Sequence, residues 1–155
     1  MRIADATLLE PKFRRALEAV LDELHAKQIP LQIYETVRSP SRQNELYARG
    51  RDENAADYGR TVTNAKAYQS AHQYGLAADL VFFVDGKWSW EAPPRMKAAW
   101  SVYHMIAEGH GLKPLSFEKP HVQIKSFDWH DLDVGPNDLN GWLEYLRARN
   151  GVGIS

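Results

Sequence analysis

The spacing of apolar residues along the chain predicts three amphipathic helices. In residues 12–27 and 95–108, apolar side chains return every three or four positions, the period of a helix with one buried face. Residues 138–149 repeat this spacing, and Pro11 and Pro30 bracket the first helix. The predicted buried faces are Phe13, Leu17, Val20, Leu21 and Leu24, then Met96, Ala99, Trp100, Tyr103, Ile106 and Ala107, then Leu139, Trp142, Leu143 and Leu146.

Three shorter segments have the pattern of β-strands. Residues 31–37 and 121–127 alternate apolar and polar side chains, whereas residues 79–84 form an almost continuous apolar run. The pair Asp85-Gly86 directly after this run predicts a tight hairpin turn. Helices mixed with such strands predict an α+β fold, in which helices pack against a small, mainly antiparallel sheet.

The remaining segments are expected to connect these elements. Ser39-Pro40 has the composition of a capped helix start, and the short helix that follows should stop at Gly50. Residues 51–70 are polar and lack a period, and loops of that length inside a domain tend to be functional. Residues 112–120 are expected to form a turn-rich connection before the last strand.

Length, charge and composition narrow the classes of function. The 155 residues contain no repeat or linker, so one domain over 1–155 is expected, with a monomer as the default. A net charge of −1 gives no general attraction to nucleic acid or membrane, and no apolar run is long enough to span a bilayer. The N-terminal residues lack a signal-peptide pattern, so we expect a cytoplasmic protein until something releases it. Because Cys is absent, a metal site would need histidines and carboxylates.

The stretch 70-SAHQYGLAADL-80 places two metal-binding residue types, His72 and Asp79, at the entry to the apolar strand. A catalytic zinc ion takes three protein ligands and keeps a fourth position for water, whose proton a nearby carboxylate accepts. His121 supplies a third ligand, and Glu118, in the turn three residues earlier, supplies the base. Each residue alone is also compatible with a structural histidine, a cap or a solvated acid, so the hypothesis depends on the combination.

The pattern HxxGxAxD at 72–79 resembles the first zinc motif of the D-alanyl-D-alanine metallopeptidases, the VanY-like enzymes, and Ser70 matches the serine that precedes it. Residues 118–121 resemble the second motif, an acidic residue and a histidine separated by two residues. Residues 36–51 resemble the arginine segment of the family. Residues 61–82, which include the sequence TNA, resemble most closely the branch of L-alanyl-D-glutamate endopeptidases from phage lysis.

The resemblance, which covers roughly residues 12–127, implies a zinc peptidase that cuts the L-Ala–D-Glu bond of the peptidoglycan stem peptide after release to the cell wall. It also implies a hedgehog or D,D-peptidase-like site with one Zn²⁺ ion. Glu118 would be the general base, and Arg38 would bind the substrate carbonyl or the developing oxyanion. Ser70 and Gln43 would contact the substrate, although capping and turn roles suit both residues as well.

Two alternatives remain open at this stage. The same site would serve a D-alanyl-D-alanine carboxypeptidase or dipeptidase, and residues 111–121 lack the Trp-Gly-Gly run of many endopeptidases, which leaves the subsite preference open. A non-catalytic zinc-binding recognition module would keep the ligands without needing Glu118 and Arg38. His130 and Trp129 are further candidates for the walls of a substrate groove.

Overall fold

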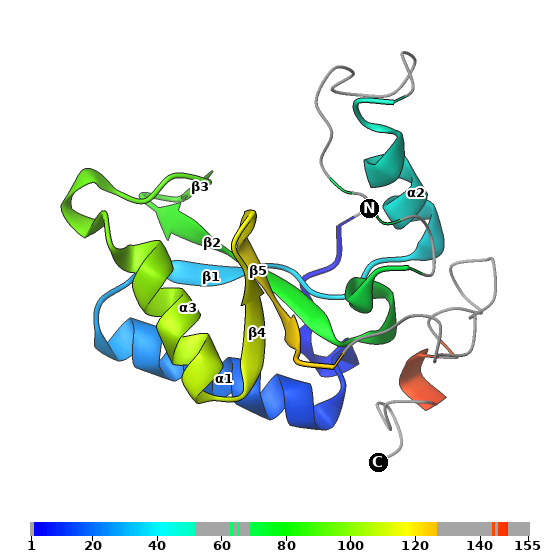
Figure 1. Cartoon of the computed structure of the whole chain (residues 1–155), viewed down its shortest axis with the longest axis horizontal. Helices are drawn as coiled ribbons and strands as arrows, with labels where there is room; N and C mark the ends of the chain where they lie inside the picture. Colours follow the sequence, from blue (N-terminus) through cyan, green and yellow to red (C-terminus); the bar gives the residue numbers. More distant parts are fainter. Residues whose placement is uncertain are drawn as a thin grey trace.

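Five antiparallel strands form the single sheet among the described residues of the computed structural model (Figure 1). The strands β1 (Leu31–Glu35), β2 (Ala77–Val84), β5 (Glu118–Ile124) and β4 (Leu112–Leu115) follow one another across the sheet, and β3 (Lys87–Ser89) also pairs with β2. This arrangement with the helices described next confirms the predicted α+β fold. The structure describes residues 2–51, 63, 65, 69–126, 144 and 146–148.

Two helices, α1 (Pro11–Ala26) and α3 (Ala99–Gly109), cover one face of the sheet (Figure 1). The first turn of α1 is capped by the Glu10 carboxylate, which accepts hydrogen bonds from two backbone N–H groups, and Pro11 occupies the first helical position. The predicted faces of both helices pack onto Leu80 and Phe82 of β2. The core therefore lies between this helical layer and the sheet.

The shorter helical elements lie at the ends of the sheet. Helix α2 (Pro40–Ala48) begins at the predicted cap, where the Ser39 hydroxyl accepts a hydrogen bond from a backbone N–H. Within the described part of the chain there are also three 3-10 turns: η1 (Ala6–Leu8), η2 (Ala71–Tyr74) and η3 (Pro94–Met96). Figure 1 shows α2 and β3 at opposite ends of β2, so the long central strand connects two different regions of the surface.

The predicted hairpin turn between β2 and β3 is confirmed. Asp85 and Gly86 both have positive φ, 53° and 75°, the backbone conformation of two-residue turns that match the twist of paired strands. Glycine and aspartate tolerate this conformation better than most residues. The turn folds Trp88 back beside Phe83 on the neighbouring strand.

The prediction of a turn-rich connection at 112–120 is wrong, because this segment is most of the β4–β5 hairpin. Glu118 is accordingly the first residue of β5 rather than part of a turn, and His121 lies within the strand. The two prolines suggested a break, but Pro114 lies on the edge strand next to a register shift, where a missing N–H is tolerated. Pro120 precedes the part of β5 that pairs with β2.

Several predicted boundaries also shift. The helix expected over 95–108 begins at Ala99, because the preceding prolines favour the separate turn η3. The strands expected over 31–37 and 121–127 end at Glu35 and Ile124. Of the last predicted helix, the structure describes residue 144 and residues 146–148 as helical, and Leu146 is buried in the core. The rest of that helix and most of the predicted loop 51–70 lie outside the described residues, as do Trp129 and His130.

Candidate functional site

Three separate elements bring the predicted metal ligands together. His72 lies in η2, Asp79 in β2 and His121 in β5. Asp79 and His121 are register partners on neighbouring antiparallel strands, so their side chains point to the same face of the sheet. Gly75 ends η2 with a φ of 71°, a left-handed conformation that glycine adopts easily, and so turns the chain from His72 into β2.

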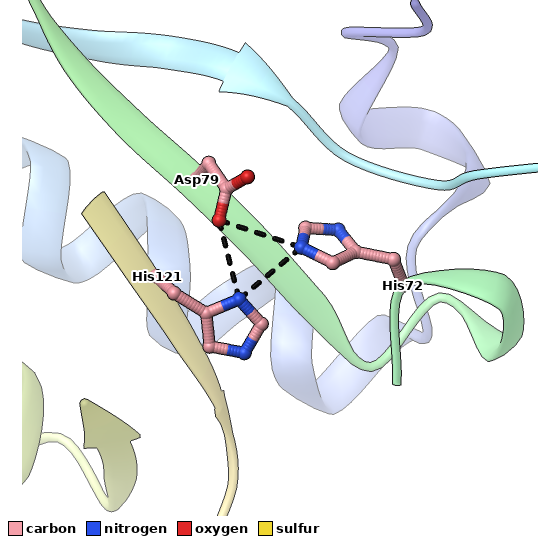
Figure 2. Close-up of side chains that lie close together, drawn as sticks. All are labelled: His72, Asp79 and His121. Carbon is pink, nitrogen blue, oxygen red and sulfur yellow. Dashed lines mark hydrogen bonds and ion pairs between the residues drawn. The ribbon is translucent and has the colours of Figure 1, made fainter. Parts of the chain in front are cut away.

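The ligand atoms form a nearly equilateral triangle, shown in Figure 2. Nε2 of His72 lies 3.2 Å from Nδ1 of His121 and 3.4 Å from Oδ1 of Asp79, and the remaining side of the triangle measures 3.2 Å. Ligands about 2.0–2.2 Å from a tetrahedral zinc ion lie roughly 3.3–3.6 Å from one another. The three atoms are therefore spaced as ligands of one tetrahedral ion would be.

Hydrogen bonds on the far side of each imidazole orient its lone pair toward the centre of this triangle. Nδ1 of His72 lies 2.6 Å from the carbonyl oxygen of Thr36, which can only accept, so this nitrogen donates and leaves Nε2 unprotonated in the neutral ring. Nε2 of His121 donates in the same way to Oε1 of Gln123, at 2.8 Å. Such outer partners are typical of metal-bound histidines. The donor set thus fits a divalent cation.

Burial and charge set the protonation of the three residues. Burial, followed by the charge of Arg38, lowers the pKa of His72 and keeps it in the neutral form that binds metals. For Asp79, burial acts to raise the pKa, but His72, His121 and Arg38 together hold it well below its usual value. The pKa of His121 is raised because its contact with Asp79 outweighs the effect of burial. A cation at the centre would therefore compete with protonation of His121.

Arg38 lies directly behind the carboxylate of the triangle. Its Nη2 donates to Oδ2 of Asp79 at 3.1 Å, its Nη1 to Oε1 of Gln43 at 3.2 Å and its Nε to Oε1 of Glu35 at 2.8 Å. These contacts, with the charges of Asp79 and Glu35, outweigh burial and raise the pKa of Arg38. The guanidinium is therefore a fixed positive charge beside the ligand triangle.

Glu118, the predicted base, lies at the open side of the site. Its Oε2 is 3.8 Å from Nδ1 of His121, and its side chain is 35% exposed, whereas the three ligand residues are buried. A carboxylate in this position lies beside the triangle and is also accessible to solvent, which is compatible with the predicted role of a general base.

The two predicted substrate-binding residues make structural contacts. The Ser70 hydroxyl caps η2 by accepting a hydrogen bond from the backbone N–H of His72. Gln43 is fully buried, and its Nε2 donates a hydrogen bond to the carbonyl oxygen of Ala65 at 2.6 Å. Its Oε1 accepts a hydrogen bond from Nη1 of Arg38. Their substrate contacts remain predictions, and the structure adds supporting roles for both.

Two further residues, Glu35 and Gln123, support the site and were not predicted from the sequence. Glu35 is buried and bridges Arg38 and Arg42, at 2.8 and 3.2 Å. Its position three residues before Arg38 could have indicated an ion pair with that arginine. The same spacing is common in exposed ion pairs, so it does not by itself predict a buried one. Gln123, which orients His121, is two residues further along the same strand face, the natural position for a neighbouring partner.

The other described histidines each contact a group outside the triangle. Nε2 of His25 lies 2.9 Å from the Leu31 carbonyl oxygen, and Nε2 of His110 lies 2.6 Å from Glu23. His104 bonds to the Lys119 carbonyl oxygen at 2.8 Å. These contacts link helices to neighbouring segments of the fold.

A comparison with protein families agrees with the motifs and the geometry. The model of the family VanY, described as D-alanyl-D-alanine carboxypeptidase, matches residues 6–131. The match spans all five strands and every residue of the candidate site. Among the residues that the structure describes, no helix is both long and apolar enough to cross a membrane.

Proposed function

The chain belongs to the VanY family of D-alanyl-D-alanine carboxypeptidases, and on that premise we propose a zinc-dependent peptidase that hydrolyses the L-Ala–D-Glu bond of the peptidoglycan stem peptide. Family membership makes the chain a peptidase that acts on peptidoglycan. The observation that carries the metal-dependent mechanism is the triangle of lone pairs with sides of 3.2, 3.2 and 3.4 Å. The choice of the L-Ala–D-Glu bond rests on the likeness of residues 61–82 to the endopeptidase branch.

In this proposal His72, Asp79 and His121 hold the ion. Zinc in such a site lowers the pKa of a coordinated water to about 7 and polarises a carbonyl group. The Glu118 carboxylate accepts the proton of the attacking water and then delivers it to the amine that leaves. Arg38 stabilises the negative charge that develops on the carbonyl oxygen, because its own charge is held nearby before the substrate arrives.

A D,D-carboxypeptidase is the second candidate, and the description of the matched family favours it. Both activities use the same ligands and base and differ in how the stem peptide extends past the metal. A non-catalytic zinc module is less consistent with the site, since such a module has no need of a carboxylate 3.8 Å from a ligand nitrogen. We further propose a role in host cell lysis, on the likeness to phage endopeptidases.

The test is to identify the bond that the purified protein cleaves. Protein of measured zinc content is incubated with purified peptidoglycan, and the new termini are determined by mass spectrometry and N-terminal labelling. A new N-terminal D-Glu supports the endopeptidase, whereas release of free D-Ala supports the carboxypeptidase. Zinc-loaded protein that produces neither product would contradict both.

A further inference from the structure

Four aromatic side chains form a cluster on the surface of the sheet, which we call the aromatic platform: Tyr34, Phe83, Trp88 and Trp90. Tyr34 meets Trp88 and Trp90 edge to face, with ring centroids 5.1 and 4.8 Å apart, and Phe83 lies 4.8 Å from Trp88. The guanidinium of Arg2 stacks on Tyr34, 4.1 Å from the ring centroid, and donates a hydrogen bond to its carbonyl oxygen. The platform is thus a preorganised group of rings with a cation at its edge.

The platform lies on the same face of the sheet as the ligand triangle. Side chains alternate along β2, so Leu80 and Phe82 enter the core while Asp79 and Phe83 point to the opposite face. These last two residues are four positions apart, which corresponds to about 13 Å of strand. The candidate active site and the platform therefore lie on the same face of the sheet, opposite the layer of α1 and α3.

Three of the four rings of the platform are exposed to solvent. Phe83 is 41% exposed, Trp88 37% and Trp90 55%, while Tyr34 is partly buried beneath them. Exposed aromatic groups gathered beside a site mark a binding surface more often than scattered apolar residues do. Because the rings are fixed by mutual contact, a ligand that stacks on them loses little of its binding energy to ordering them.

We propose that the aromatic platform binds a sugar of the glycan strand to which the stem peptide is attached. A pyranose ring has a face of C–H bonds that stacks on aromatic rings, and hydroxyl and acetamido groups that remain in water or meet a polar neighbour such as Arg2. This inference rests on the proposed function, since it assigns the sugar end of the same substrate to the surface next to the metal site. The position of the platform on the same sheet face as the candidate site, four residues along β2, is what selects this occupant.

The experiment compares two substrates that differ only in the sugar. Hydrolysis of a soluble muropeptide that carries its disaccharide is measured beside hydrolysis of the same stem peptide without sugar. For the variant with Trp88→Ala and Trp90→Ala, we expect KM for the muropeptide to rise roughly tenfold at unchanged kcat, while hydrolysis of the free peptide stays the same. Met105→Ala, an exposed apolar residue on α3, is the matched control and should change neither substrate.

A binding measurement separates this inference from the proposed function. Chitotetraose, a soluble oligomer of N-acetylglucosamine, should bind the unaltered protein in calorimetry and shift the indole N–H signals of Trp88 and Trp90 in NMR spectra, whether or not the protein cleaves peptides. The sugar-binding role of the platform would be contradicted if chitotetraose did not bind. It would also be contradicted if the double variant lost hydrolysis of the muropeptide and of the free peptide equally. A dimer of the unaltered protein that the double variant converts to a monomer would contradict it as well. If chitotetraose binds but no bond is cleaved, the proposed function fails and the saccharide site stands.

Discussion

Arg38 binds one oxygen of the Asp79 carboxylate, and the other oxygen faces the two histidines of the site. Oδ2 of Asp79 accepts a hydrogen bond from Nη2 of Arg38 at 3.1 Å, while Oδ1 faces Nδ1 of His121 at 3.2 Å. The arginine thus fixes the orientation of the carboxylate and leaves a single oxygen facing the two histidines. In the proposed mechanism, its positive charge also stabilises the oxyanion.

Replacing Arg38 should therefore weaken both metal binding and catalysis. For Arg38→Ala we expect a loss of about 10²–10³-fold in kcat, typical of a lost oxyanion contact, and of about 10–100-fold in zinc affinity. Arg38→Lys should recover part of the charge effect but not the three-way hydrogen bonding. Peptide hydrolysis and zinc competition with a chelator give the two quantities. An Arg38→Ala enzyme with unchanged kcat would remove Arg38 from the mechanism.

Glu118→Gln should separate metal binding from proton transfer. The amide has nearly the same shape as the carboxylate but cannot accept the proton of the attacking water, so we expect kcat to fall by about 10²–10⁴-fold. Zinc content should be unchanged, because Glu118 is not one of the three ligands proposed. Metal analysis and single-turnover hydrolysis test both statements, and a fully active Glu118→Gln enzyme would show that another group is the base.

Gln123 should matter for zinc affinity although it is not a ligand. Gln123→Ala removes the Oε1 atom that accepts the hydrogen bond from Nε2 of His121 and so keeps Nδ1 free for the metal. For this variant we expect zinc affinity to fall by about 10–100-fold. Gln32→Ala is the matched control, because Gln32 is an exposed glutamine on β1. Competition titrations with a chromophoric chelator measure the difference. Equal affinities in the two variants would contradict the orienting role.

Glu35 and Glu45 provide a comparison between a buried and an exposed ion pair. Glu35→Ala leaves Arg38 and Arg42 without their buried partner, and we expect a loss of about 3–5 kcal/mol in the free energy of unfolding. Glu45→Ala removes an exposed partner of Arg42 and Arg49 and should lower it by less than about 1 kcal/mol. Chemical denaturation of zinc-loaded protein measures both. A similar small loss in the two variants would show that Glu35 does not anchor the arginines.

Removal of the metal should destabilise the fold through the site. A ligand that binds the folded state at 100 times its Kd stabilises it by about 2.7 kcal/mol, so EDTA should lower the Tm of the zinc-loaded protein by several degrees. His121→Ala removes one ligand and should make the Tm insensitive to EDTA. Thermal unfolding with and without chelator checks this. An equal shift in both proteins would mean that EDTA acts elsewhere.

Much of the fold and site could be predicted because the signals are local in the chain. Helical spacing identified α1 and α3, and the Asp85-Gly86 pair identified the β2–β3 hairpin. The β4–β5 hairpin was missed because its prolines suggest turns, and only the sheet shows that Pro114 lies on an edge where no N–H is needed. Local preferences cannot report the position of a strand within a sheet.

By itself, the sequence determined which residue types are available for the site: a histidine and an aspartate at the entry to one strand, a histidine at the start of another with an acid three residues earlier, and an arginine after a third. The tertiary structure decided how they are arranged. The register of β2 with β5 set the triangle of ligand atoms, and the packing of Glu35, Gln43 and Asp79 around Arg38 set the orientation of its charge. These relations join residues up to 49 positions apart, as for His72 and His121. Distances between such residues follow from the folding of the whole sheet, because no local rule of spacing connects them.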